Sequence, residues 1–585
     1  MRRPLTAALL VFATLSTFAQ SEWITPFEER GYNYSPPYDE TIDYFKRLAE
    51  RSDYGEMIAF GETARGRTLY VFVASKDRAF TPEAARASEK PVVLIINGIH
   101  SGEIMGKDAS MILLREILVE KTAADLLDRL TLLIVPVYNA DGHERSSPYN
   151  RINQNGPETT GWRTTAQNLN LNRDWLKADA PETRAILSLA RARDPDVVID
   201  NHTDDGADFQ YPLTYGVEDE ANVERNLAAF TREEFVPHLE ARLEVEGYPT
   251  APYFWYRDGD PMNGLIEWVG TPRYSHSYFA ARNRLALLIE THALKPYKTR
   301  VFADLAAMKA TLEFVNENAE KIRRVVARAD AETVQRLAID RKPYPIRFRR
   351  TDEPDTVLYR GVRSVREPSD ISGAERIIYT GEPLDVRLPN YRNFIVEDSV
   401  TAPYAWIIPP EWRDIAERLE LHGVEIGRLE EARKLEATTY RLENAEFASA
   451  PYEGRHTVEF DVVPTKETTT APVGSYVVRA EQPTLRLLLY ALEPASEESF
   501  ARWGFFNAIF EQKEWFSPYR METIAAEMYE SDPALRLEFE NKLATDEAFR
   551  NDPRARLTFF YERSPYADEQ KNRYPIIRVE RPTEF

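Results

Sequence analysis

The sequence predicts an α/β fold in which a mixed, mainly parallel sheet is flanked by helices, followed by an α+β C-terminal region. The first observation is a series of short, continuous apolar runs, which are typical of strands buried on both faces. The second is that segments with helical spacing of apolar residues alternate with these runs. The third is a change of texture past about residue 335, where a polar, proline-containing connector precedes shorter β-like runs.

Four apolar runs predict the strands of the sheet, and they lie at residues 91–96, 132–137, 197–199 and 285–289. A helix is expected at residues 104–120, directly after the first run. A second helix is expected to begin near Pro181, because proline is favoured in the first helical turn. A third is expected over about residues 300–328. Strands and helices that alternate in this way form a mainly parallel sheet with helices on both faces.

The C-terminal half predicts a separate region. Its β-like runs lie at residues 356–359, 376–379, 384–388, 404–408, 457–463 and 475–479, and its helices are expected at residues 410–421 and 521–561. We therefore expect one catalytic α/β domain over residues 20–335 and an accessory α+β region over residues 340–585, in one or two subdomains.

The N-terminus has the layout of a secretory signal peptide. Arg2 and Arg3 form a basic start, residues 5–18 are uncharged and mostly apolar, and Ala19 ends a small-residue motif suited to cleavage. The apolar run is too short to span a bilayer, and no later run reaches the length of a membrane span. We expect a signal peptide at residues 1–19 and a secreted or periplasmic protein with no membrane span.

Composition limits the chemistry that is available. The 585 residues include no Cys, which excludes disulfides, thiolate nucleophiles and Cys-ligated metals. Any metal must therefore be held by His and carboxylate side chains. The formal net charge of −21 argues against nucleic acid as a partner.

Candidate metal ligands fall at the ends of predicted strands. His100 and Glu103 follow the first apolar run, His202 follows the third, and Glu290 closes the fourth. Because the carboxyl ends of parallel strands meet at one edge of a sheet, these side chains are expected to lie together. His100, Glu103 and His202 would form a three-ligand set that leaves one position on zinc open for water.

Two further features fit hydrolysis of a peptide tail. Glu290 could act as general base, because an unligated carboxylate beside a zinc-bound water can take its proton and pass it to a leaving amine. Asn172 and Arg173 could bind a carboxylate, since a guanidinium supplies two hydrogen bonds and the adjacent amide a third. Each motif alone is more often a chance or structural pair, and the strand-end placement of three segments favours the functional interpretation.

Taken in order along the chain, the motifs resemble those of the zinc metallocarboxypeptidase family, which includes the pancreatic carboxypeptidases and their bacterial relatives. The matching elements are His100-x-x-Glu103, Asn139-Ala-Asp141-Gly142, Asn172-Arg173, His202 after a strand, and Glu290 after a late strand. The resemblance covers about residues 38–330 and looks like a divergent bacterial branch.

The resemblance implies a carboxypeptidase-like fold and a zinc ion held by His100, Glu103 and His202. It also implies Glu290 as general base and acid. The expected partner is a peptide substrate with a free C-terminal carboxylate, bound by Asn172 and Arg173.

Some positions depart from the family pattern. Gln154 stands where the family has an Arg that polarises the scissile carbonyl, and Arg163 is our substitute candidate. Asn170 stands where the family often has an Asp that orients the first His ligand. The family's capping Tyr has no clear match, and Tyr278, its nearest candidate, is more simply a packed aromatic.

Two alternatives remain open at this point. The first keeps the zinc chemistry but changes the reaction to that of a deacylase or amidase acting on small N-acyl or cell-wall substrates. The second is a non-catalytic zinc-binding or peptidoglycan-binding protein in which residues 340–585 are the functional module. Glu290 argues against the second, because a structural site has no need of a base.

Overall fold

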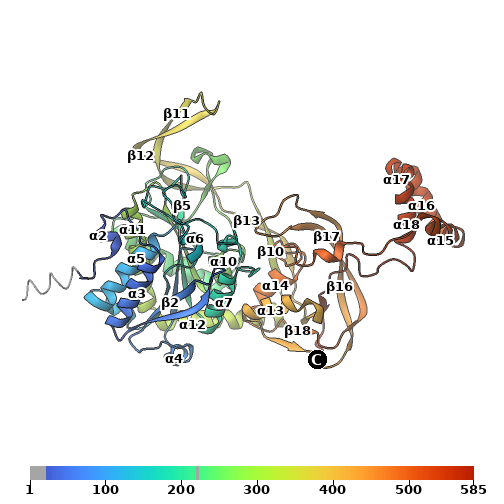
Figure 1. The fold of residues 1–585 in the computed structure, drawn as a ribbon, viewed down its shortest axis with the longest axis horizontal. Coiled ribbons are helices and arrows are strands. Elements are labelled where there is room, and N and C mark those ends of the chain that lie inside the picture. Colours follow the sequence, from blue (N-terminus) through green and yellow to red (C-terminus); the bar gives the residue numbers. More distant parts are fainter. Residues whose placement is uncertain (1–21, 219–222) are drawn as a thin grey trace, which may run out of the picture.

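The computed structural model describes residues 22–218 and 223–585 (Figure 1). The predicted signal peptide at residues 1–19 lies outside the described residues. None of the helices in the described ranges combines the length and the apolar character that a bilayer span requires.

A seven-stranded sheet forms the centre of the N-terminal half, in the order β1-β2-β4-β3-β5-β9-β6. Its strands are β1 (Gly55–Glu62), β2 (Thr68–Ala74), β3 (Val92–Asn97), β4 (Thr131–Val135), β5 (Val197–Asp204), β6 (Leu213–Gly216) and β9 (Leu285–His292). The four central strands β4, β3, β5 and β9 pair in parallel, and the outer strands pair antiparallel. This arrangement confirms the predicted mixed, mainly parallel sheet, and all four predicted strands are its central ones.

Helices cover both faces of this sheet, with α3, α5 and α11 on one side and α6, α7 and α10 on the other (Figure 1). The helices of this half are α2 (Pro26–Glu29), α3 (Tyr38–Arg51), α4 (Pro82–Ala87), α5 (Met105–Arg115), α6 (Ala140–His143), α7 (Pro181–Arg193), α8 (Arg225–Phe230), α9 (Val236–Val245), α10 (Ser275–Ala281), α11 (Tyr297–Glu317) and α12 (Ala319–Thr333). The single helix expected over residues 300–328 is two helices, because the chain leaves helical geometry at Asn318.

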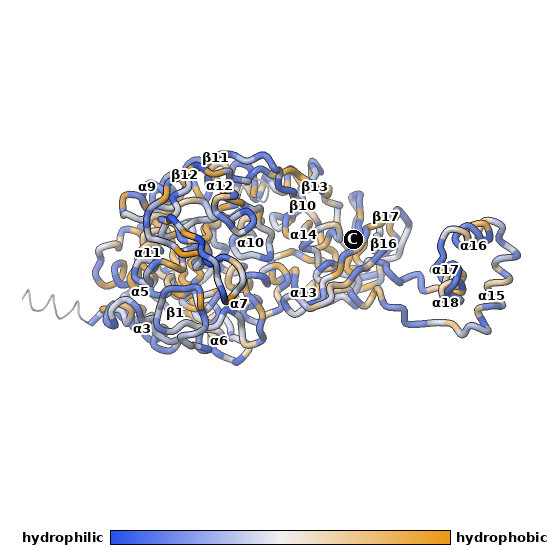
Figure 2. Tube along the Cα trace, turned by 90° about the horizontal axis from the view of Figure 1, so that it is seen from above, coloured by the Kyte–Doolittle hydropathy of each residue, from blue (hydrophilic) through white to orange (hydrophobic). Residues whose placement is uncertain are grey.

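The C-terminal half contains a six-stranded sheet in the order β15-β18-β14-β19-β16-β17. Its elements are β14 (Ala405–Ile408), β15 (Ile426–Arg428), β16 (Arg433–Phe447), β17 (Val458–Ala471), β18 (Tyr476–Arg479), β19 (Ile577–Val579), α13 (Arg413–Leu421) and α14 (Leu485–Leu492). Figure 2 shows that the apolar segments of both halves run through the interior of the molecule.

A long hairpin projects from the molecule near the N-terminal half (Figure 1). It consists of β11 (Asp355–Pro368) and β12 (Glu375–Tyr391), and the two β-like runs expected within residues 376–388 are one continuous strand. The base of β12 pairs with β8 (Leu265–Ile266), which pairs in turn with β7 (Trp255–Tyr256). A separate two-stranded pair joins β10 (Tyr344–Arg350) to β13 (Phe394–Val400).

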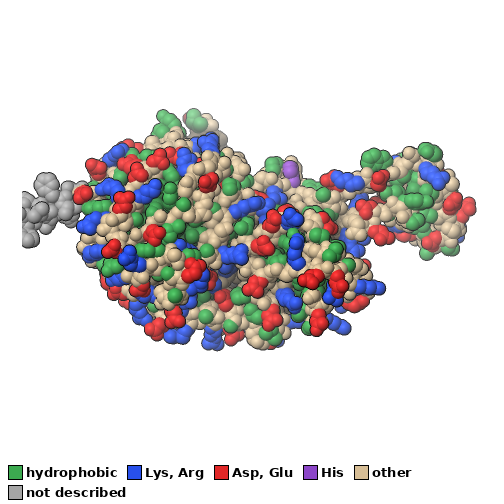
Figure 3. Space-filling model, turned by 60° about the horizontal axis from the view of Figure 1, so that its bottom comes forward, with side chains coloured by type: hydrophobic (Ala, Val, Ile, Leu, Met, Phe, Trp, Pro, Cys, Tyr) green, Lys and Arg blue, Asp and Glu red, His purple; other side chains and the backbone are tan. Residues whose placement is uncertain are grey.

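The last helical group forms a lobe set apart from the rest of the molecule (Figures 1 and 3). It comprises α15 (Pro518–Ser531), α16 (Pro533–Thr545), α17 (Glu547–Asn551) and α18 (Pro553–Tyr561), and it buries its own apolar cluster. The helical stretch expected here is divided at Asp532, Asp546 and Asp552. Asp532 and Asp552 each precede a proline, which disfavours helical geometry in the preceding residue.

Candidate metal centre and active site

The candidate ligands come from neighbouring strands of the parallel part of the sheet. His100 follows β3 in a turn that begins at Gly98, whose φ of 67° favours glycine. His202 lies on β5 directly opposite Glu290 on β9. Residues paired in this way project from the same face of a sheet, so His202 and Glu290 share one face.

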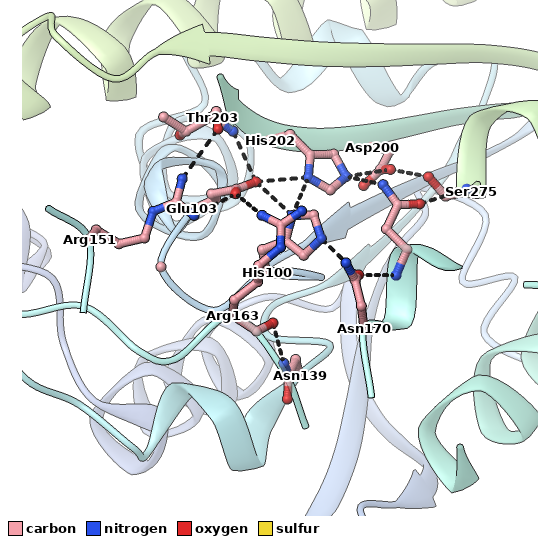
Figure 4. A network of polar contacts seen from close by, with 12 residues as sticks. His100, Glu103, Asn139, Arg151, Arg163, Asn170, Asp200, His202, Thr203 and Ser275 are labelled. Atoms are coloured by element: carbon pink, nitrogen blue, oxygen red, sulfur yellow. Dashed lines mark hydrogen bonds and ion pairs between the residues drawn. The ribbon is translucent and has the colours of Figure 1, made fainter. Parts of the chain in front are cut away.

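Three side chains converge closely at this edge (Figure 4). Glu103 Oε2 lies 3.0 Å from His100 Nδ1 and 2.9 Å from His202 Nδ1, and the two Nδ1 atoms are 3.2 Å apart. All three residues are buried, and among the described residues they are the one such group with metal-binding potential. A single zinc ion could bond to all three of these atoms at distances of about 2.0–2.2 Å.

The other nitrogen of each imidazole is held by an acceptor. His100 Nε2 lies 3.0 Å from Asn170 Oδ1, and His202 Nε2 lies 2.7 Å from Asp200 Oδ2. Each ring therefore donates from Nε2 and leaves Nδ1 with a free lone pair. The two Nδ1 atoms and Glu103 Oε2 are then all electron-pair donors with no hydrogen between them. A cluster of this kind is suited to binding a cation.

The second oxygen of Glu103 faces two guanidinium groups. Its Oε1 lies 3.1 Å from Arg151 Nη1 and 3.2 Å from Arg163 Nη1. Burial alone would raise the pKa of Glu103, but His100 and Arg151 hold it well below the usual range. Glu103 is therefore ionised, as a metal ligand must be.

The two histidines experience opposite electrostatic environments. Burial lowers the pKa of His100 to about 4, which keeps the ring neutral at pH 7. Burial also acts to lower the pKa of His202, but the Asp200 carboxylate outweighs it and raises that pKa well above the usual value. A divalent cation at Nδ1 would oppose this protonation, because its charge reverses the local preference.

Glu290 is poised to hold a proton. Burial raises the pKa of its carboxyl well above the usual value, and the charges of Glu103, Asp204 and Asp200 add to this shift while His202 opposes it. A carboxyl group with a raised pKa near a metal site has the property that general acid–base catalysis needs.

The structure places the predicted carboxylate-binding residues beside the same cluster. Asn172 Nδ2 lies 3.2 Å from His202 Nε2, and Asn172 Oδ1 accepts a hydrogen bond from Ser275 N. The Arg173 guanidinium donates to the Asn172 carbonyl oxygen at 2.7 Å and lies over the Tyr274 ring at 4.4 Å. All seven residues singled out in the sequence therefore come from segments that meet at this edge of the sheet.

Sequence reasoning missed three neighbours of the cluster. Asp200 stands two positions before His202 on β5, so an Asp-x-His pattern on a strand could have identified it as a partner on the same face. Arg151 gave no local signal for its contact with Glu103. Tyr253 is brought near by the fold, because its backbone N–H donates to Tyr215 O and Tyr215 pairs with Ile289, next to Glu290.

Two departures from the family pattern are resolved by the geometry. An amide oxygen of Asn170 occupies the position beside His100 where a carboxylate was the expected partner. Tyr278 is a core residue, as the simpler interpretation held: it is fully buried, packs against Trp175 at 5.4 Å and hydrogen-bonds His422 at 3.0 Å.

Comparison with known proteins gives an independent view. Residues 41–233 match the family model described as zinc carboxypeptidase. Carboxypeptidase 2 of Trichophyton rubrum is 23% identical over 488 residues, which cover 80% of this chain and 84% of that protein. Carboxypeptidase 2 of Trichophyton tonsurans is 24% identical over 498 residues, with the same coverage. The metallo-carboxypeptidase from Burkholderia cenocepacia aligns over 48% of this chain and 70% of that chain, with 20% identity and a TM-score of 0.37.

The family match and the fungal relatives support a metallocarboxypeptidase, and hence an enzyme. The matched segment includes His100, Glu103 and His202. Because the fungal alignments cover 80% of the chain, the similarity continues well into the C-terminal half. These curated relatives are fungal, so the bacterial branch stays a prediction.

Proposed function

We propose that this chain is a zinc-dependent carboxypeptidase that hydrolyses the C-terminal peptide bond of peptide substrates. The observation that supports this best is the meeting of His100 Nδ1, His202 Nδ1 and Glu103 Oε2 at about 3 Å from one another. A carboxyl group with a raised pKa, Glu290, lies on the same face of the sheet. A purely structural zinc site has no need of such a neighbour.

His100, Glu103 and His202 would hold the ion, and the rest of the chemistry falls to other residues of the chain. A bound zinc supplies a Lewis acid and lowers the pKa of a water in its open position. Glu290 would accept the proton of the attacking water and then donate it to the departing amine. The burial that raises its pKa helps Glu290 keep this proton between the two steps.

The positive charges around the site suit a substrate with a terminal carboxylate. Arg173 and the Asn172 amide would bind that carboxylate through three hydrogen bonds. The guanidinium groups of Arg163 and Arg151 contact Glu103 Oε1, the oxygen that faces away from the two histidines. From there, either group could also stabilise the negative charge that develops on the scissile carbonyl oxygen. Arg163 is the more exposed of the two and remains our candidate for this role.

The proposal is tested by metal analysis and by hydrolysis of a short peptide library with and without a chelator. We expect about one zinc per chain, release of single C-terminal residues, and loss of activity on chelation that added zinc restores. Cleavage in the middle of peptides, or undiminished cleavage after the metal is removed, would contradict the proposal.

A deacylase or amidase acting on small N-acyl or cell-wall substrates is the second candidate, because its metal chemistry would be the same. Amidation of the substrate's α-carboxylate separates the two. A carboxypeptidase loses most of its activity on the amidated peptide, since Arg173 then has no anionic partner, whereas an amidase of this second kind does not distinguish the two forms.

We also propose that the protein is secreted or periplasmic, on the basis of the basic start and apolar run in residues 1–19. N-terminal sequencing of the protein recovered from culture medium or periplasm should begin at Gln20. Recovery only from the cytoplasm with Met1 intact would contradict this.

A further inference from the structure

Helix α13 and a loop at residues 452–455 of the C-terminal half reach the segment that supports the metal ligands. Residues 340–585 contact residues 170–179 at several points. Arg455 makes two hydrogen bonds of 2.7 Å with Asp179, Arg418 Nη1 donates to the carbonyl oxygens of Lys177 and Ala178, and His422 Nε2 lies 2.9 Å from Leu176 O. These bonds hold a segment that begins at Asn170, the residue that contacts His100.

The contact nearest the metal centre comes from Glu453. Its Oε2 accepts a hydrogen bond from the backbone N–H of Asn170 at 2.8 Å. Glu453 lies in a tight turn closed by two backbone hydrogen bonds between Tyr452 and Arg455, and its φ is 46°. Leu169 lies within 3.2 Å of the position that a Cβ on Gly454 would take, so the turn sits directly against the Asn170 segment.

A short chain of hydrogen bonds links Glu453 to the His100 imidazole. Asn170 Oδ1 lies 3.0 Å from His100 Nε2 and also accepts from Asn172 N at 2.9 Å. Fixing the backbone of Asn170 therefore fixes an oxygen on which the orientation of the His100 ring depends.

We propose that Glu453 is a positioning residue for the metal centre, acting through Asn170 on His100, so that the C-terminal half completes the active site. This inference rests on the proposed zinc site, but it does not require that the substrate is a peptide. Partners behind a metal-bound His typically change metal affinity about 10- to 100-fold when they are removed. Glu453 is one bond further away, so we expect a smaller effect, about 3- to 10-fold.

The test measures the zinc dissociation constant of the full-length protein by competition with a chelating indicator. Glu453→Ala should raise this constant about 3- to 10-fold. Glu453→Gln keeps an acceptor oxygen and should stay within about twofold of the wild type. Glu446→Ala removes an exposed glutamate from β16 of the same half and serves as the matched control, with no change expected.

A double-mutant cycle separates positioning from a general loss of stability. Asn170→Ala alone should weaken zinc binding, and adding Glu453→Ala to it should weaken binding no further, because the route through the Asn170 side chain is already lost. Additive effects of the two substitutions, or a Glu453→Ala protein that binds zinc like the wild type, would overturn the proposal. If the Glu453→Ala protein does not fold, the Glu453→Gln protein becomes the test. A zinc affinity of Glu453→Gln well below that of the wild type would then overturn the proposal as well.

The outcome is distinguishable from a failure of the proposed function. A wild-type protein that binds zinc but cleaves no peptide defeats the carboxypeptidase assignment and leaves the cycle on zinc affinity intact. Conversely, an active carboxypeptidase whose zinc affinity is insensitive to Glu453→Ala defeats only the positioning role.

Discussion

The two carboxylate oxygens of Glu103 contact different groups. Its Oε2 faces His100 and His202, and its Oε1 faces Arg151 and Arg163. The His100–Glu103 pair was predictable, because the residues are three positions apart and follow a recognisable strand. The arginine contacts were not, because they depend on where a loop some fifty residues later returns to the sheet.

At the residue scale, the role of Glu290 is the most direct test of the chemistry. Glu290→Gln keeps the size of the side chain but replaces the carboxylate, which can accept a proton, with a neutral amide. We expect kcat to fall about 10²- to 10⁴-fold while zinc content stays at the wild-type level. Steady-state kinetics together with metal analysis check this, and a variant that retains wild-type kcat would remove Glu290 from the mechanism.

Arg173 gives a second prediction at this scale, concerning binding of the substrate carboxylate. Arg173→Ala should raise KM for peptides with a free C-terminus about tenfold or more, because a charge-assisted pair of hydrogen bonds is lost. Amidated peptides, which are poor substrates at the outset, should be affected little. Arg173→Lys keeps the charge but loses the paired hydrogen bonds of the guanidinium. Its KM for peptides with a free C-terminus should therefore lie between the values of the wild type and Arg173→Ala. Equal effects on both peptide forms would contradict this role.

At the element scale, helix α5 begins directly against the strands that carry the site. A Cβ on Gly106 would overlap Asn97 Oδ1 and lie 2.6 Å from Asn201 Nδ2, so only glycine allows the helix to approach β3 and β5 this closely. Asn97 and Asn201 are themselves hydrogen-bonded to each other at 2.8 Å. This packing sets the distance between the two strands and the first turn of the helix.

Gly106→Ala is therefore expected to lower the free energy of unfolding by about 1–3 kcal/mol through overpacking. Gly427→Ala on β15 is the matched control, because the nearest atom to its Cβ would be Val477 Cβ at 3.7 Å, an ordinary contact. Urea unfolding of both variants checks this. A Gly106→Ala protein as stable as the Gly427→Ala protein would show that the helix can shift without cost.

The burial of each strand explains how much of the fold the sequence could predict. The central strands β3, β4, β5 and β9 were predictable because both of their faces are buried, which produces continuous apolar runs. The edge strand β1 was missed because it is half-buried and its sequence alternates irregularly. The pairing of β8 with β12, more than a hundred residues later, had no local signal at all.

At the scale of the whole molecule, His422 of the C-terminal half is buried and contacts two residues of the N-terminal half. Its Nε2 lies 2.9 Å from Leu176 O, its Nδ1 lies 3.0 Å from Tyr278 OH, and its side chain is fully buried. Burial lowers the pKa of His422 from 6.5 to about 3. The neutral ring is therefore part of the folded state, and protonation favours the unfolded chain.

The sign of the pH effect follows from this depressed pKa. The contribution of His422 is complete above pH 6.5 and is lost as the pH falls toward 3, by up to about 1.4 kcal/mol per pH unit. His422→Gln should be less stable than the wild type at pH 7 and should lose stability less steeply between pH 6.5 and 4.5. Urea unfolding across this range measures both slopes, with His456→Gln, at an exposed position, as control. Parallel slopes for wild type and His422→Gln would contradict the assignment.

Strand β19 lies between β14 and β16, although its residues come about 170 positions after the first strand of that sheet. Until Ile577–Val579 are available, the group β15-β18-β14 and the hairpin β16-β17 have no strand to join them. The chain up to Val579 must therefore leave the ribosome before this sheet can close, and until then its unpaired strand edges can pair with other chains. Chaperone binding to the nascent chain should accordingly persist until residues 577–579 have emerged from the ribosome.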